Sequence, residues 1–246
     1  MKNNIFMKGN WENLIIKSYS CKKELLEKYL PNNVELDLYQ GKGVFSMVAF
    51  TFSKVKFFGV KVPFHQLFGE INFRFYVKSK IDGKKGVVFL KEYANKPIIA
   101  FMANKIYNEP FFVHKVNRQV TSTSNLRFIN YPFFLKNKWQ KVSALVKKST
   151  TKLKPNSLQE FIVDRYTAFV KGRKNTLEYQ INHKPWKLFS IKKINISKEI
   201  LNLLPKDFKQ SQELSTYIVD GSEITVEKGI LQNNINLALA RRMFQP

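Results

Sequence analysis

The chain has 246 residues, 44% of them hydrophobic, with 22 Phe and 10 Tyr. This composition supplies a substantial core, and no Pro/Ser/Gly-rich linker or internal repeat divides it, so we expect a single domain over residues 1–246. A polar start and the lack of an apolar run of about 18 residues predict a cytoplasmic protein without a secretory signal or transmembrane segment. The single cysteine, Cys21, excludes an intramolecular disulfide.

The formal net charge of +24 raises the question of a polyanionic partner. Such a field attracts nucleic acid or an anionic membrane surface without specific contacts. Only seven of the 42 basic residues are Arg, the side chain that forks onto phosphates and guanines, and the lysines are scattered along the chain. We therefore favour a solvated basic surface, consistent with A- and T-rich coding, over nucleic-acid binding. Polyanion or membrane-surface binding stays as an alternative.

The first part of the chain is predicted to form strands around one helix. Apolar patterning places a strand at 11–19, a helix at 21–30, a strand at 34–39 and a strand at 44–53. Ser20 can cap the helix. The strand at 44–53 is apolar on both faces, so we expect it to be central and covered on both sides. Residues 54–68 lack a clear period and predict a long loop over a cavity mouth.

Residues 70–77 alternate strictly between two unlike faces. The polar face carries Glu70, Asn72, Arg74 and Tyr76, and the apolar face carries Ile71, Phe73, Phe75 and Val77. Successive side chains on one face lie about 6.5 to 7 Å apart, close enough to bind one small ligand or each other. The polar face is either solvated or internal. We predict an internal face on which Glu70 and Arg74 are paired or share a polar network, because the apolar face would pack under the helices.

The middle of the chain predicts a hairpin, a helix and further strands. The elements follow as a strand at 87–93, a helix at 97–107, one or two strands within 111–128 and a hairpin within 128–148. Asp82 and Gly83 supply turn chemistry before the first of these strands. Pro97 suits the first turn of the helix.

A capping box from Ser157 to Glu160 marks a second clear helix, predicted to run to residue 171. Arg165 falls among its apolar positions. Its stem can snorkel to the surface, or its guanidinium can point inward as an anchor for a carboxylate. We predict that Arg165 faces the interior, because apolar side chains flank it at spacings of three and four residues.

The remaining patterning predicts strands at 177–182, 187–196, 214–219 and 223–226, with a short helical segment at 198–204 and a turn at Asp220 and Gly221. The whole inventory is about ten strands and three helices. It predicts an α+β fold that is mainly antiparallel β, either a barrel or a strongly bent sheet with helices packed on it.

Seven motifs follow one another between residues 34 and 186, within a resemblance that extends over about residues 11–226. They are VELD (34–37), GVFSMVAF (43–50), GEINFRFYV (69–77), GVVFL (86–90), NEPFF (108–112), SLQEFIVDRY (157–166) and HKPW (183–186). In this order they resemble the YqjF-like proteins, a bacterial family of unknown function that is similar in fold to acetoacetate decarboxylase. The resemblance implies a conical, closed or nearly closed antiparallel β-barrel with about three packed helices and a cavity lined from several strands.

The resemblance also bears on the chemistry of the cavity. An acidic residue of the decarboxylase cavity matches Glu70. The decarboxylase carries Pro-Lys-Lys after its helix, and the first of these lysines forms the Schiff base, whereas this chain has Pro110, Phe111 and Phe112. Acetoacetate decarboxylase activity is therefore not expected. Lys115 stays open as a displaced lysine, because strand alternation puts it on the same face as Phe111.

These observations favour a protein that binds a small organic ligand, such as a carboxylate, in a barrel cavity without Schiff-base chemistry. The candidate ligand-binding residues are Glu70, Asn72, Arg74, Phe111, Phe112, His114, Arg165 and His183. His183 is either a structural hydrogen-bonding residue or an acid-base catalyst. The alternatives are polyanion or membrane-surface binding and a structural or interaction module, and the sequence leaves homo-oligomerisation and catalysis open.

Metal and cofactor sites are not predicted. The three histidines lack the spacing of a metal-binding helix, and a single cysteine cannot complete a zinc site. The glycines are dispersed and form no phosphate loop, dinucleotide fingerprint or nucleophile elbow.

Overall fold

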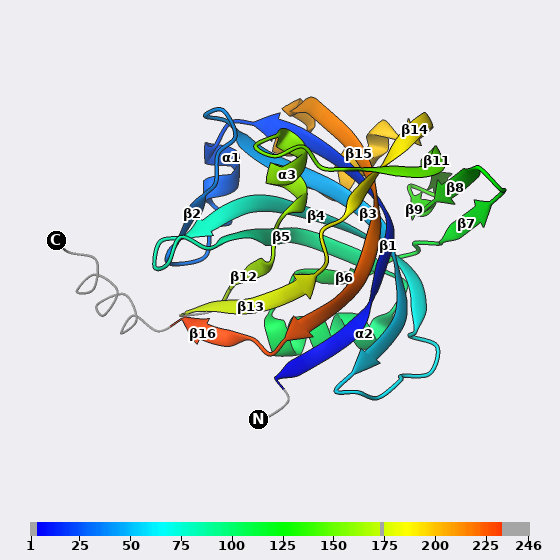
Figure 1. The fold of residues 1–246 in the computed structure, drawn as a ribbon. Coiled ribbons are helices and arrows are strands. Elements are labelled where there is room, and N and C mark those ends of the chain that lie inside the picture. The colour runs from blue at the N-terminus through cyan, green and yellow to red at the C-terminus, as the bar shows by residue number, and fades with distance from the viewer. Residues whose placement is uncertain (1–3, 173–174, 233–246) are drawn as a thin grey trace.

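The computed structural model describes residues 4–172 and 175–232. Most of its strands belong to one sheet that curls into a ring (Figure 1). The ring strands, in spatial order, are β13 (Thr176–His183), β12 (Thr167–Lys171), β5 (Lys85–Ala94), β4 (Leu67–Ser79), β3 (Gly43–Phe57), β1 (Ile5–Cys21) and β15 (Gln212–Glu227). A further pairing between β13 and β15 brings the two ends of this series together.

The sheet continues past β15 and supports smaller elements. Strands β14 (Lys187–Ile196), β11 (Val142–Lys152), β8 (Leu126–Asn130) and β7 (Gln119–Ser122) extend it in that order. The short strands β2 (Val34–Leu36), β6 (Phe111–Val113) and β16 (Ile230–Gln232) pair with β4, β5 and β13, and β9 (Phe133–Leu135) pairs with β10 (Lys138–Gln140). The mainly antiparallel barrel expected from the sequence is confirmed.

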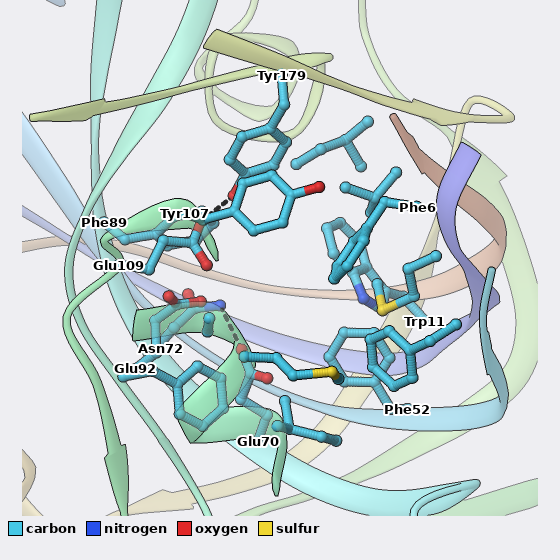
Figure 2. Close-up of a pocket in the computed structure, with 18 of the residues that line it drawn as sticks. Phe6, Trp11, Phe52, Glu70, Asn72, Phe89, Glu92, Tyr107, Glu109 and Tyr179 are labelled. Atoms are coloured by element: carbon cyan, nitrogen blue, oxygen red, sulfur yellow. Dashed lines mark hydrogen bonds between the residues drawn. The ribbon is translucent and has the colours of Figure 1, made fainter. Parts of the chain in front are cut away.

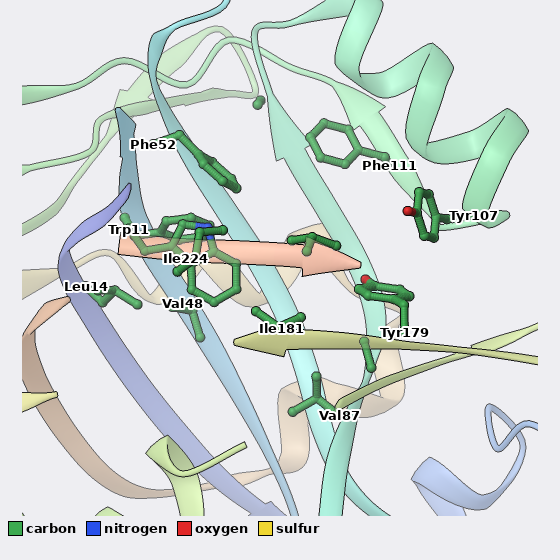
Figure 3. Packing of buried hydrophobic residues seen from close by; sticks show 14 of the residues in the cluster. Trp11, Leu14, Val48, Phe52, Val87, Tyr107, Phe111, Tyr179, Ile181 and Ile224 are labelled. Carbon is green, nitrogen blue, oxygen red and sulfur yellow. The ribbon is translucent and has the colours of Figure 1, made fainter. Parts of the chain in front are cut away.

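Two hydrophobic cores lie on opposite faces of the ring wall. Figure 3 shows the inner core, to which β3 contributes Val48 and Phe52. The outer core includes Phe45 and Met47 from the same strand, together with Phe208 and other side chains of the segments that cover the ring. A strand whose successive residues enter different cores must be apolar throughout, so β3 is central as predicted.

The helix predicted at 97–107 forms, but the helices predicted at 21–30 and 157–171 are shorter than the patterning predicts. They are α1 (Glu24–Glu27), α2 (Pro97–Met102), the π-helix η1 (Ala103–Tyr107), α3 (Leu158–Val163), and the 3₁₀ segments η2 (Lys198–Leu203) and η3 (Lys206–Gln210). The prediction of a helix from Cys21 capped by Ser20 is wrong, because both residues pair with β3 in the sheet. No helix among the described residues is long and apolar enough to cross a membrane.

The predicted helix at 157–171 is also only partly correct. The capping box forms, since the Ser157 hydroxyl accepts a hydrogen bond from the Glu160 backbone amide, but α3 ends at Val163. The chain then enters the ring as β12, where its backbone groups bond to β13. Arg165 is therefore in a connection between helix and strand, yet its side chain is buried as predicted.

The last pair of predicted strands is a single strand in the structure. The turn predicted at Asp220 and Gly221 does not form, because β15 runs through both residues and pairs with β1 on either side of them. Gly221 has φ +84°, and a Cβ atom there would lie 2.0 Å from the carbonyl oxygen of Trp11. The glycine therefore permits a local irregularity in a continuous strand rather than a hairpin.

Replacing Gly221 with alanine should destabilise the protein strongly, since both the positive φ and the approach of Trp11 oppose a side chain. We expect a loss of at least about 3 kcal/mol in the free energy of unfolding. Gly83→Ala is the control, because Gly83 also has positive φ but faces open space, and it should cost about 1 kcal/mol. Urea unfolding of both variants measures the difference, and equal losses would contradict this account of Gly221.

Candidate functional site

A cavity of about 90 Å³ lies inside the ring, and residues of α2 and of the start of β1 contribute to its wall (Figure 2). Aromatic and aliphatic side chains form most of its wall, and Glu70, Asn72, Glu92, Glu109 and Tyr179 supply polar groups. In Figure 2 the rings of Phe6, Trp11 and Phe52 lie across the cavity from Glu92 and Glu109. The cavity thus has an apolar side and an acidic side.

Three buried carboxyl groups line the cavity from separate segments. Glu70 lies on β4, Glu92 on β5, and Glu109 in the connection after η1, with exposed fractions of 3%, 5% and 9%. The Asn72 amide donates a hydrogen bond of 3.1 Å to Glu70 Oε1, and the Tyr179 hydroxyl donates to Glu109 Oε1. Glu92 Oε1 and Asn72 Oδ1 are buried and have no hydrogen-bond partner in the described structure.

Burial without a neighbouring cation raises the pKa values of all three carboxyls. The pKa of Glu70 rises to about 8, mainly by desolvation and further by the charge of Glu109. Desolvation raises the pKa of Glu109 to about 7, although hydrogen bonds from Tyr179 and Glu92 oppose the rise. Desolvation and the other two carboxyls hold the pKa of Glu92 well above its usual range. The cavity therefore holds protons near neutral pH.

A register shift in β5 places Glu92 inside the ring. Phe89 lines the cavity, so strict alternation from Phe89 would turn Lys91 inward. The register of the β4–β5 pairing shifts between Phe73 and Arg74. As a result, the side chain of Glu92, and not that of Lys91, faces the cavity. Lys91 instead lies outside, with its Nζ 5.6 Å from the ring centre of Phe112. Sequence alternation alone therefore missed Glu92.

Glu70 and Asn72 both line the cavity, but Arg74 does not join them. All three side chains are buried, as predicted for an internal face. The predicted pairing of Glu70 with Arg74 is wrong, because four residues along a strand separate side chains by about 13 Å. Arg74 instead donates a 3.3 Å hydrogen bond to the Ile162 carbonyl, and its buried Nε has no partner in the described structure.

Arg165 is held away from the cavity by its own contacts. Its Nη1 donates to Asp37 Oδ2 at 2.6 Å, and its Nε donates to the Phe161 carbonyl at 2.7 Å. The guanidinium also lies 5.2 Å from the ring centre of Tyr76. Arg165 and Asp37 thus form a buried ion pair with a structural role, and the other contacts hold the guanidinium in place.

The two candidate histidines also lie outside the cavity. His183 is stacked against Tyr166 and Trp186 at ring distances of 4.5 and 4.2 Å, and burial lowers its pKa. His114 packs edge-on against Tyr93 at 5.5 Å.

Phe111 and Phe112, which follow Pro110, lie on opposite sides of the cavity wall. Phe111 is buried and lines the cavity, whereas Phe112 is exposed and stacks on Tyr93. Lys115 does not replace the missing lysine, since it is exposed and its Nζ lies over the ring of Phe134. Among the described residues that line the cavity, none is Lys, Arg or His.

Glu109 was not singled out from the sequence, where it appeared only in the NEPFF motif (108–112) that follows the helix predicted at 97–107. Asn108 adopts a left-handed conformation with φ 56°, and the Glu109 amide then donates to the Ala103 carbonyl at 3.2 Å. This helix ending turns the Glu109 side chain towards Tyr179. In the part of the chain that the structure describes, no group of three or more His, Cys, Asp or Glu side chains could hold a metal ion.

The ring, its cavity and the covering segments define a protein with the acetoacetate decarboxylase-like fold. The chain superposes on acetoacetate decarboxylase from Legionella pneumophila subsp. pneumophila str. Philadelphia 1 with a TM-score of 0.61 at 12% identity, covering 94% of this chain and 90% of that one. An acetoacetate decarboxylase-like enzyme from Sphingomonas wittichii RW1 gives 0.60 at 10% identity, covering 93% of each chain. The enduracididine biosynthesis enzyme MppR, complexed with pyruvate, gives 0.60 at 10% identity, covering 96% and 93%.

The sequence comparison narrows this class to a family. Residues 8–222 match the model of DUF2071, described as "Uncharacterized conserved protein", and the chain belongs to this family. The chain is also 24% identical to the uncharacterized protein YqjF of Bacillus subtilis (strain 168) over 186 residues, 74% of each protein. The resemblance based on motif order is therefore confirmed.

Replacing Glu70 with Gln should make stability less sensitive to pH. The folded-state pKa of Glu70 is raised from 4.5 to about 8, so its protonated form favours folding, and this stability is lost as the pH rises from about 4.5 through about 8. Glu70→Gln retains an acceptor for Asn72 and cannot ionise. We expect its stability relative to wild type to grow by up to about 1.4 kcal/mol per pH unit in that window.

Urea unfolding at pH 5, 6.5 and 8 measures this difference. Glu213→Gln is the control, because the Glu213 side chain is 64% exposed and lies outside the cavity. If Glu70→Gln and wild type lose stability in parallel over this pH range, Glu70 does not carry the raised pKa.

Proposed function

We propose that this chain binds a small organic molecule in the ring cavity through noncovalent contacts, without a Schiff base. The observation that carries the proposal is the pair of buried acceptor atoms, Glu92 Oε1 and Asn72 Oδ1, which line the cavity without partners in the described structure. A buried acceptor left unpaired costs about 1–3 kcal/mol, so a ligand that satisfies both gains that energy. Small-molecule sites typically combine apolar walls with a few such polar groups.

Two further observations support noncovalent binding. A Schiff base requires an amine in the cavity, and the described lining has Phe111 after Pro110 and no lysine. The solved complex of MppR with pyruvate supports the idea that a ring of this fold can hold a small organic molecule. The decarboxylase reaction itself does not transfer, since a fold at this level of identity does not specify chemistry.

Filling the cavity should weaken binding. Ala103 lines the cavity from η1 and is only half-buried, so Ala103→Phe can occupy the space with little strain. We expect compounds from a panel of small organic cations, neutral alcohols and carboxylates to raise the melting temperature of wild type, and Ala103→Phe to lose at least about tenfold in affinity by calorimetric titration. If no compound distinguishes wild type from Ala103→Phe, the proposed function fails.

A separate experiment tests the proposal that binding is noncovalent. Wild type is incubated with acetoacetate, reduced with borohydride and weighed as an intact chain. We expect an unchanged mass or sparse labelling of surface lysines. A stoichiometric adduct that maps to one lysine would overturn noncovalent binding as the mode of action.

A second candidate function, association with an anionic membrane surface, is supported by the exposed aromatic side chains near the cavity. The loop between β3 and β4 exposes Phe58 and Phe64, the latter 90% exposed, and α2 exposes Phe101. Lys96 Nζ donates to the Phe64 carbonyl at 2.5 Å and joins the two segments. Exposed aromatics beside lysines on a chain of net charge +24 suit a surface that is both apolar and anionic.

Vesicle binding tests this second candidate. We expect sedimentation with phosphatidylglycerol vesicles but not with phosphatidylcholine vesicles, since lysines contribute only on an anionic surface. The double substitution Phe64→Ser and Phe101→Ser should lower the bound fraction at least about tenfold, because two apolar side chains no longer insert. Phe128→Ser on β8 is the control for an exposed Phe outside this surface. Equal binding of both variants would exclude the proposed surface.

A further inference from the structure

We infer that the cavity takes a small organic cation with N–H donors, such as a protonated primary amine. This inference rests on the proposed function and narrows it to one class of ligand. Its basis is the chemistry of the groups that face the cavity: two unpaired acceptor atoms, three carboxyls and an aromatic wall.

The unpaired atoms determine the hydrogen-bonding character of the ligand. Asn72 uses its amide N–H to bond Glu70, which leaves its carbonyl oxygen Oδ1 free to accept. Glu92 Oε1 is likewise buried and unpaired. A primary ammonium group carries three donors and no acceptor, so one such group can bond to both oxygens. A carboxylate ligand has no donor for either atom.

The charges that face the cavity are of one sign. Its titratable lining residues are Glu70, Glu92, Glu109, Tyr107 and Tyr179, and no cationic side chain is among the described lining residues. An ionised carboxylate in such a site is destabilised unless a counter-charge is present. A bound ammonium supplies that counter-charge, whereas a bound anion would add to the repulsion.

The opposite wall suits the organic part of such a ligand. Phe6 and Trp11 line it, and aromatic faces attract organic cations and cover their alkyl groups. Trp11 Nε1 is buried without a partner in the described structure, so a hydroxyl or carbonyl oxygen at the far end of the ligand would find a donor there. By volume, 90 Å³ accommodates on the order of six heavy atoms.

Binding of an ammonium ion should be linked to the release of a proton. At neutral pH the carboxyls hold protons, and the ammonium favours the ionised form, so one carboxyl gives its proton to solvent as the cation enters. An alkylammonium keeps its own proton between pH 6 and 8, because its pKa is close to that of lysine, about 10.4. Its affinity should therefore rise with pH in this range, by up to about tenfold per unit for one proton released. An anionic ligand would show the opposite slope.

Three compounds with the same carbon skeleton test the inference: 3-methylbutylammonium, 3-methylbutan-1-ol and 3-methylbutanoate. Calorimetric titration of the full chain at pH 6, 7 and 8 measures their affinities. We expect the ammonium to bind at least tenfold more tightly than the alcohol at pH 8, with affinity increasing with pH. Glu92→Gln should weaken ammonium binding at least tenfold and change alcohol binding less than threefold.

Matched variants keep the test decisive. Glu213→Gln, an exposed carboxylate outside the cavity, should leave both affinities unchanged. If Glu92→Gln does not fold, Glu70→Gln provides the same loss of charge on β4. Binding of the alcohol or the carboxylate equal to or tighter than that of the ammonium, or an ammonium affinity that does not rise with pH, overturns the inference while the proposed function stands. If no compound of the panel distinguishes wild type from Ala103→Phe, both fall together.

Discussion

The pairing of β13 with β15 is the contact on which the cavity depends. The paired residues include Ile181 with Val226, and both of these side chains line the cavity. The same pairing fixes β13 so that the Tyr179 hydroxyl reaches Glu109, which lies in the connection after η1. Without the β13–β15 pairing the sheet would be open and twisted, and the carboxyl groups of Glu70, Glu92 and Glu109 would face water. The raised pKa values and the unpaired acceptors are therefore consequences of closure.

Distance along β4 explains how one strand face can carry an acidic and a basic side chain that do not pair. Glu70 faces the cavity, and Arg74, farther along β4, lies near Arg165 and contacts the carbonyl of Ile162. Of these two arginines, Arg165 alone has a carboxylate partner among the described residues, Asp37. The interior is thus divided along the strand into an acidic cavity and a basic region. The net charge of +24 is a sum over the whole chain and gives no information on either region.

Much of the wall could be predicted from the sequence because strand alternation is local. The alternation at 70–77 placed Glu70, Asn72 and Arg74 inside, and the doubly apolar pattern of β3 identified a central strand. The lengths of the helices expected at 21–30 and 157–171 could not be predicted in the same way. Cys21 and Thr167 both have helix-compatible neighbours, but each lies in a strand whose backbone hydrogen bonds are made with another part of the chain. Such long-range pairing overrides local propensity and leaves no local signal.

The acidic character of the cavity depends on one irregularity that local patterns do not reveal. Phe89 and Glu92 both face inward although they are three residues apart, an arrangement that only a register shift in β5 allows. In a regular strand, the side chain of Lys91 would point into the cavity. Lys91 would then form an ion pair with Glu70. The pKa of Glu70 would then fall, and the site would resemble a neutral pocket rather than an acidic one. A one-residue slip in strand pairing thus changes the charge that a ligand meets, without changing the composition of the chain or its fold.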